Sequence, residues 1–196
     1  CLYCHAGKVA VDAKDPSRYD EPIFLEASIG CERCHGPGGQ HVQAMQQLAE
    51  GEACEDCRIV NPADLDPARR EAVCNQCHLA GEAAIPRYGR GLYDFRPGDH
   101  LDDTLVVFVE GQRAGSGRAV SQVEQMQSSR CYQASGEVMG CTTCHDPHWQ
   151  PPPEEAAAFF DNRCATCHET DDCGLDEPQR LAHASGGSCI ACHMPS

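Results

Sequence analysis

The sequence has few of the aliphatic and aromatic residues from which protein cores are built. Ile, Leu, Val and Phe together contribute 31 of the 196 residues, and there is a single Trp. A share of these residues below about 20%, combined with a high net charge, is typical of disordered chains, and the formal charge here is −15. An ordered fold therefore requires apolar material other than side chains.

Basic residues and long apolar runs are also scarce. Only 15 Lys and Arg stand against 30 Asp and Glu, a balance that argues against nucleic acid as a partner. No stretch approaches the roughly 20 consecutive apolar residues of a transmembrane helix, so no transmembrane segment is predicted. Because the chain starts at Cys1, we expect an export signal to have been removed before it.

Cysteine, in contrast, is abundant, and most of it belongs to one repeated motif. Six copies of Cys-x-x-Cys-His are present, and this is the attachment signature of c-type haem. Two thiols bond to the vinyl groups of one haem, and the adjacent His becomes the proximal iron ligand. A zinc site also uses paired Cys-x-x-Cys units, but it does not need His directly after each pair. In chain order, motifs 1 to 6 supply Cys1, Cys4 and His5; Cys31, Cys34 and His35; Cys74, Cys77 and His78; Cys141, Cys144 and His145; Cys164, Cys167 and His168; Cys189, Cys192 and His193.

Six covalently attached haems would resolve the shortage of core residues. The macrocycles supply large apolar faces, so the haems form the core and the peptide wraps around them. We therefore predict a mostly α and irregular fold, with short helices and long loops around a stack of six haems, as a single domain over residues 1–196. The last three motifs begin 23 and 25 residues apart, which requires their haems to be near neighbours.

Several helices can be predicted from local signals. Asp66 followed by Pro67 is a strong helix start, and that helix runs into motif 3. Further helices are predicted over residues 41–50, 119–129, 154–163 and 179–184. Residues 104–110 are rich in strand-forming residues but are also compatible with a helical turn.

Four cysteines remain outside the motifs: Cys54, Cys57, Cys131 and Cys173. An even number of remaining cysteines in an exported protein suggests disulfides, and four cysteines can pair in three ways. We favour Cys131 with Cys173, which leaves Cys54 with Cys57. The alternatives for the last pair are two free thiols, or a seventh haem site that lost its His, because Arg58 stands where His would be.

Several stretches resemble a known family, the multihaem cytochromes with doubled Cys-x-x-Cys-His motifs. This family is related to the tetrahaem cytochrome that takes electrons from hydroxylamine oxidation, and it is often fused to tetratricopeptide repeats, which are absent here. The similar stretches are CERCHGPGGQH, IVNPADLDPARREAVCNQCHLAGEA, DFRPGD, VEQMQSSRCYQASGEVMGCTTCHDPH and SCIACHMPS.

The resemblance implies haems stacked in pairs, bis-His ligation at most irons, and electron transfer. It also implies that His41 and His148 are distal ligands and that Cys131 and Cys173 have a structural role. The chain departs from its relatives in opening and closing directly on haem motifs. We therefore expect either a trimmed piece or flanks replaced by a neighbouring subunit.

Histidines are too few to fill every axial position. Six haems have twelve axial positions, and the chain has ten His, of which six are proximal. The four spare residues, all candidate distal ligands, are His41, His100, His148 and His183.

At least two distal positions must therefore be filled in another way. Met could ligate and raise the potential of that haem, and the candidates are Met126 and Met139, followed by Met45 and Met194. Alternatively, a neighbouring subunit donates a His, or water leaves an iron open to substrate.

These observations favour electron transfer by a periplasmic or extracellular hexahaem cytochrome, which passes single electrons along closely packed haems and needs no catalytic residue. Its partners would be redox proteins or copies of itself, as a polymerising extracellular filament or as a subunit of a larger redox complex. The alternative is a multihaem oxidoreductase with one open haem that acts on a small nitrogen or sulfur oxyanion. The Lys-ligated motif of ammonia-forming nitrite reductases is absent, because all six motifs carry His.

Low-temperature electron paramagnetic resonance of the oxidised native assembly would show how the missing positions are filled. If all six haems are low-spin, Met or another chain supplies the missing ligands, and electron transfer is favoured as the function. One or two high-spin haems would reveal an open iron and favour the oxidoreductase.

The same measurement tests His41 and His148. Because each is predicted to be a distal ligand, we expect His41→Ala and His148→Ala each to convert one haem to high spin and to slow electron transfer. An unchanged spin state in both variants would remove them as ligands.

Overall fold

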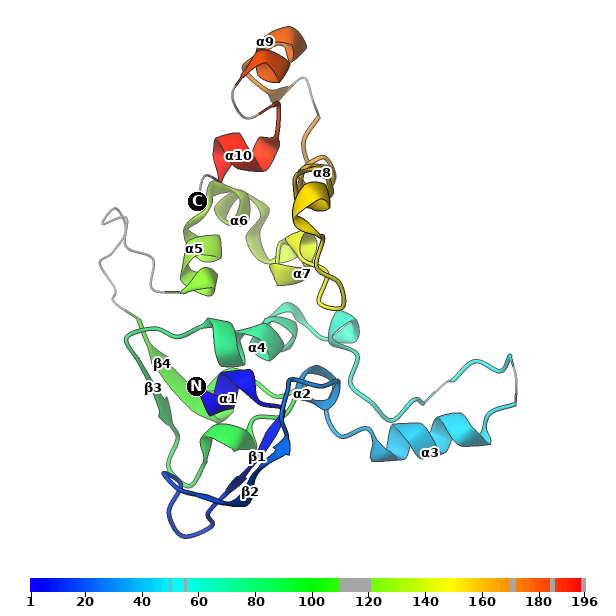
Figure 1. The fold of residues 1–196 in the computed structure, drawn as a ribbon, viewed down its shortest axis with the longest axis vertical. Helices are drawn as coiled ribbons and strands as arrows, with labels where there is room; N and C mark the ends of the chain where they lie inside the picture. The colour runs from blue at the N-terminus through cyan, green and yellow to red at the C-terminus, as the bar shows by residue number, and fades with distance from the viewer. Residues whose placement is uncertain (50, 55, 110–120, 170–171, 184–185, 195–196) are drawn as a thin grey trace. The chain divides into compact units, whose positions relative to one another are not determined.

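The structure is a computed structural model that describes all residues except 50, 55, 110–120, 170–171, 184–185 and 195–196 (Figure 1). Its contacts group the chain into two compact units, Cys1–Val138 and Met139–Ser196. Motifs 1 to 3 lie in the first unit and motifs 4 to 6 in the second. The single domain over residues 1–196 stays a prediction, which this grouping does not decide.

The first unit begins with a short helix and a hairpin. Helix α1 (Leu2–His5) precedes strands β1 (Lys8–Val11) and β2 (Tyr19–Glu26), which pair antiparallel with Val9 opposite Phe24. Val9 is buried, whereas most of β2 is exposed. The strand over β2 follows from its Tyr, Ile and Phe residues, which favour extended backbone.

Helices α2 and α4 carry motifs 2 and 3, with helix α3 between them. Helix α2 (Glu32–His35) is followed by α3 (Gly39–Gln47). Helix α3 overlaps the predicted helix 41–50 but begins and ends earlier. After the 3₁₀ turn η1 (Pro62–Asp64), helix α4 (Pro67–His78) begins as predicted. The Asp66 carboxylate accepts the Arg69 amide at 3.1 Å, and Pro67 occupies the first helical position.

A second hairpin and two helices complete the first unit. Strands β3 (Ala83–Pro86) and β4 (Leu105–Phe108) pair antiparallel, so residues 104–110 contain a strand rather than a helical turn. Their connection holds the 3₁₀ turns η2 (Leu92–Asp94) and η3 (Leu101–Asp103). Then follow α5 (Gln122–Ser128), within the predicted helix 119–129, α6 (Arg130–Ser135) and the 3₁₀ turn η4 (Gly136–Val138).

The described part of the second unit consists of short helices and loops. Helix α7 (Cys141–Cys144) holds motif 4, and α8 (Pro153–Cys164) matches the predicted helix 154–163 and ends on motif 5. Helix α9 (Glu177–Ala182) corresponds to the prediction 179–184, whose last residue lies outside the described residues. Helix α10 (Cys189–His193) holds motif 6.

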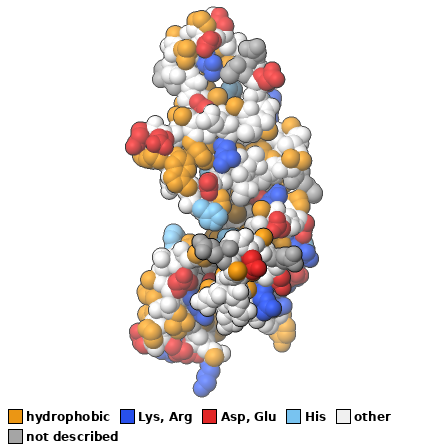
Figure 2. Space-filling model, turned by 90° about the vertical axis from the view of Figure 1, so that its right-hand side faces the viewer, with side chains coloured by type: hydrophobic (Ala, Val, Ile, Leu, Met, Phe, Trp, Pro, Cys, Tyr) orange, Lys and Arg blue, Asp and Glu red, His pale blue; other side chains and the backbone are white. Residues whose placement is uncertain are grey.

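Very little of the peptide forms a core. The buried hydrophobic residues of the described chain are Ala6, Val9, Ala72, Val73, Phe95, Leu105 and Val123, all in the first unit. Large apolar side chains lie at the surface instead, and Phe24 and Trp149 are 48% and 46% exposed. Figure 2 shows hydrophobic side chains mixed with charged ones over the face in view. The structure thus has the small side-chain core that the composition predicts.

None of the helices in the described ranges combines the length and apolar character needed to cross a bilayer.

The N-terminus of α5 offers a test of local stability. The buried Ser121 hydroxyl accepts the Glu124 amide at 3.4 Å and donates to the Glu124 carboxylate at 2.9 Å. Such a cap contributes about 1 kcal/mol, so Ser121→Ala should lower the free energy of unfolding by that amount in a denaturant titration. The matched control is Ser128→Ala at the exposed far end of α5. Equal losses in the two variants would contradict the capping role.

Candidate functional site

All six motifs adopt the same helical turn. In four of them the His amide donates to the carbonyl of the first Cys, and the remaining two turns lie inside α4 and α10. An α-helix advances about 100° per residue, so cysteines three positions apart lie on one face of the turn. This arrangement fits the two-point attachment of a haem, with His directly beside it. The bonds measure 2.9 Å at His35 and 3.0 Å at His5, His145 and His168.

None of the twelve motif cysteines forms a disulfide, and each is exposed or half-buried. Most candidate iron ligands are also accessible. The exposed histidines are His5, His78, His145, His148, His168, His183 and His193, and the half-buried ones are His35, His41 and His100.

Motif 2 faces a cavity of about 710 Å³ that both His35 and His41 line. The Gly36–Gly39 turn reverses the chain between them, and Gly36 has a φ of +76°, a conformation that favours glycine. His41 is therefore brought back beside motif 2, as the turn residues predict. The cavity is also lined by Cys57 and Val60.

Backbone carbonyls hold both histidine rings of this cavity. His35 donates from Nδ1 to the Val60 carbonyl at 2.8 Å, and His41 donates from Nδ1 to the Cys57 carbonyl at 2.7 Å. A carbonyl can only accept, so each Nδ1 carries the proton, and in the neutral ring Nε2 holds the electron pair that binds a metal. Metal-ligating histidines are usually oriented in this way. No sequence signal marks the carbonyls of Cys57 and Val60.

Next to these carbonyls the sulfurs of Cys54 and Cys57 are joined in a disulfide. This contact agrees with a disulfide as one of the three alternatives for the pair, and the degenerate haem site stays an alternative. Arg58 does not continue a helical turn, because its φ is +49°. Cys131 and Cys173 belong to different units, and their pairing stays a prediction.

His100 lies beside the helix that carries motif 3. It lines a cavity of about 270 Å³ together with Ala72, Asn75 and Leu105. The Asn75 side-chain oxygen is buried and has no hydrogen-bond partner among the described residues. The motif 3 cysteines and His78 do not line this cavity, so His100 faces the Asn75 side of α4.

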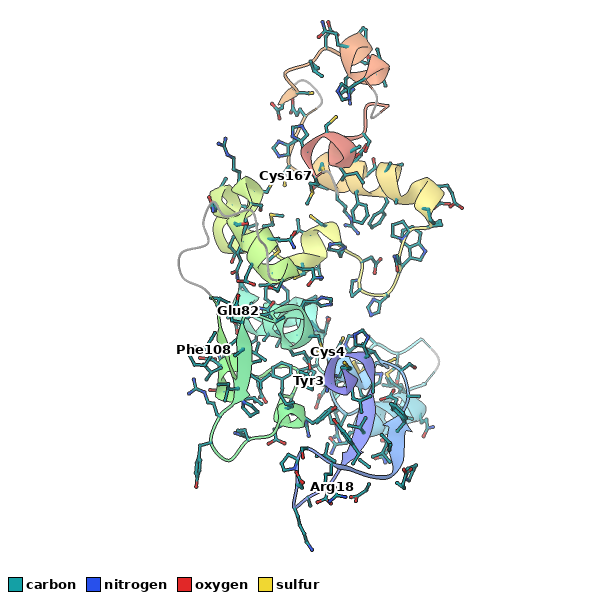
Figure 3. All side chains as sticks on the ribbon, turned by 60° about the vertical axis from the view of Figure 1, so that its left-hand side comes forward. Tyr3, Cys4, Arg18, Glu82, Phe108 and Cys167 are labelled. Carbon is teal, nitrogen blue, oxygen red and sulfur yellow. A yellow bond between two sulfur atoms is a disulfide. The ribbon has the colours of Figure 1, made fainter. Side chains whose placement is uncertain are left out.

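The cysteines of motifs 1 to 3 affect one another electrostatically. Burial, with a smaller effect of the neighbouring Cys4 thiol, raises the pKa of Cys77 to about 11. Burial and the nearby Cys74 thiol likewise raise the pKa of Cys34. These thiols therefore stay protonated at neutral pH, and the three motifs of the first unit are neighbours. Figure 3 labels Cys4 where α1 lies against α4.

In the second unit, α8 connects all three motifs. The His145 ring of motif 4 packs edge-on against Phe160, with ring centroids 5.6 Å apart. The Asp161 carboxylate accepts the amides of Cys189 at 2.9 Å and Ile190 at 3.4 Å, at the start of motif 6. Motif 5 begins at the last residue of α8. Motifs 4 to 6 are thus neighbours, as their spacing requires.

The remaining candidate ligands lie close to motifs or on short elements. His183 Nδ1 is 4.0 Å from the Cys192 sulfur of motif 6. The His148 amide donates to Asp146 at 2.9 Å, just after motif 4. Met126 lies in α5 and Met139 precedes α7, and both are half-buried. Their ligation stays a prediction.

A site built from protein ligands alone was not found in the described ranges. No group of three or more His, Cys, Asp or Glu there could hold a metal ion. A zinc site of four Cys or His ligands would need such a group, whereas a haem iron takes only axial ligands from the protein.

No family model matches the chain, and neither a curated protein nor a solved structure matches it. Conclusions about function therefore rest on the residues and their geometry.

The Asp161 contact can be tested by hydrogen exchange. Asp161→Ala removes the acceptor of the Cys189 and Ile190 amides, so these amides should exchange faster and α10 should lose about 1 kcal/mol of local stability. The matched control is Asp176→Ala, because Asp176 caps α9 through the Gln179 amide at 2.9 Å. If the control speeds exchange at residues 189–190 as strongly, Asp161 is not what holds motif 6 to α8.

Proposed function

We propose that the chain is a hexahaem c-type cytochrome that passes single electrons between closely spaced haems. The observation that carries the proposal is one helical turn built six times, each with two accessible thiols on one face and His beside them. The arrangement of three motifs in each unit supports short distances between neighbouring haems.

The role of this chain's residues is to bind and orient. The motif cysteines would hold each haem covalently, and the following His would ligate its iron from one side. At motif 2, His41 is the best-supported distal ligand, because it shares the cavity of His35 and because the Cys57 carbonyl orients its ring. A bound haem supplies an iron that accepts and returns one electron, so no protein side chain needs to react.

Charge and cysteine chemistry support the partner and the compartment. With 30 acidic and 15 basic residues, the surface suits a redox partner with a basic patch, or close contact with copies of the same chain. Many carboxylates near a haem stabilise its ferric state and lower its potential. A disulfide between Cys54 and Cys57 fits an exported protein, either periplasmic or extracellular.

Haem stoichiometry tests the proposal. Expressed in a host that attaches haem c, the intact chain should show the mass of six haems and a matching pyridine haemochrome spectrum. Replacing both cysteines of one motif, Cys189→Ala with Cys192→Ala, should leave five haems. The control Cys54→Ala with Cys57→Ala should keep six, because that pair forms a disulfide.

A chain that carries no covalent haem in such a host would overturn the proposal. A wild type with seven haems, of which the Cys54 and Cys57 control keeps six, would instead identify that pair as a further attachment site.

A further inference from the structure

The three motifs of the first unit are joined through the residues that precede their second cysteines. These residues are Tyr3 in motif 1, Arg33 in motif 2 and Gln76 in motif 3. At about 100° per residue, this position lies on the side of the turn away from the two thiols. The three side chains can therefore meet without blocking haem attachment.

The contacts between them form a chain. Arg33 donates from Nη2 to the Tyr3 carbonyl at 2.7 Å, and its guanidinium carbon lies 4.5 Å from the centre of the Tyr3 ring. The buried Gln76 donates from Nε2 to the Arg33 carbonyl at 3.3 Å. Motif 3 is thus bonded to motif 2, and motif 2 to motif 1.

Tyr93 closes this cluster from the loop between β3 and β4. Its ring meets the Tyr3 ring edge-on at 5.3 Å, and it lies 5.8 Å from the Arg33 guanidinium carbon. We call Tyr3, Arg33, Gln76 and Tyr93 the junction. Figure 3 labels Tyr3 beside Cys4, where α1 lies against α4.

The charge of Arg33 is not balanced within the junction. The described residues form ion pairs at Arg58, Arg69, Arg70 and His168, and Arg33 has no carboxylate partner among them. Its Nε is buried and makes no hydrogen bond to a described residue.

An unbalanced charge in a partly buried place acts over a longer distance than one in water, because the effective dielectric constant is lower. When an electron arrives from a donor redox protein, a ferric haem becomes ferrous and its net charge falls by one. A nearby cation favours the ferrous state. It therefore raises the reduction potential of each haem that it reaches.

We propose that Arg33 is a positioning residue that joins the three attachment turns of the first unit and, through its positive charge, raises the reduction potentials of their haems. This inference rests on the proposed function. The equivalent residues of motifs 4 and 5 are Thr143 and Thr166, and each hydrogen-bonds within three residues of itself. Motifs 4 and 5 are therefore not joined in this way.

The experiment compares the haem-loaded wild type with Arg33→Gln in a spectroelectrochemical titration. We expect Arg33→Gln to retain six haems and to shift part of the titration curve to more negative potential. Arg69→Gln is the matched control, because Arg69 lies exposed in the same unit and already pairs with Asp66 at 3.4 Å. Its curve should coincide with that of the wild type, since exposed charges are screened.

A second variant separates charge from position, and it keeps the test decisive if Arg33→Gln fails to load haem. Arg33→Lys keeps the charge at neutral pH, so its curve should match the wild type there. The free Lys pKa is about 10.4, and burial lowers it. Its potentials should therefore fall as pH rises through the Lys pKa, more than those of the wild type.

Two results would overturn the inference. One is a fully loaded Arg33→Gln protein with wild-type potentials, and the other is an Arg33→Lys protein whose pH dependence equals that of the wild type. Failure of the proposed function looks different, because the wild type itself would then carry no covalent haem.

Discussion

The placement of two thiols on one face of a single helical turn is the constraint on which the rest of this structure depends. The turn needs only five residues and one or two backbone hydrogen bonds, so it forms wherever the motif occurs, whether in the isolated turn of α1 or at the end of α8. Longer elements are arranged around these turns. Helix α8 holds motifs 4 and 6 through Phe160 and Asp161, and Arg33 joins the turns of the first unit.

Short sequence signals such as helix caps predicted the local structure. They could not predict contacts between residues far apart in the chain. Asp66 and Pro67 specify the start of α4 within four residues, so that prediction was confirmed. The β1–β2 hairpin was not predicted, because strand pairing depends on a partner elsewhere in the chain. The motif residues could be identified from their spacing along the chain. The junction could not, because its residues come from separate parts of the chain. Arg33 and Gln76 lie 43 residues apart, and their contact depends on how two separate turns face each other.

The small core and the charge of the chain are connected through the same turns. Buried apolar side chains in the described residues are few, so packing between side chains contributes little to stability. Polar contacts contribute more to holding the elements together. Asp161 at α10 and Arg33 at the junction are both links from a charged side chain to backbone groups. Such bonds are stronger than neutral ones. In the first unit the link also leaves a cation without a carboxylate partner among the described residues, in a chain with twice as many acidic as basic residues.

The Cys54–Cys57 disulfide is better explained by the orientation of His41 than by global stability. It closes a loop of only four residues, and the chain-entropy relation gives such a loop roughly 2 kcal/mol, less than a longer loop would provide. Its local effect is more specific. Cys57 contributes both a sulfur to the bridge and the carbonyl that receives the His41 ring at 2.7 Å. Restricting the backbone at Cys57 restricts that carbonyl, and with it the direction in which His41 presents Nε2.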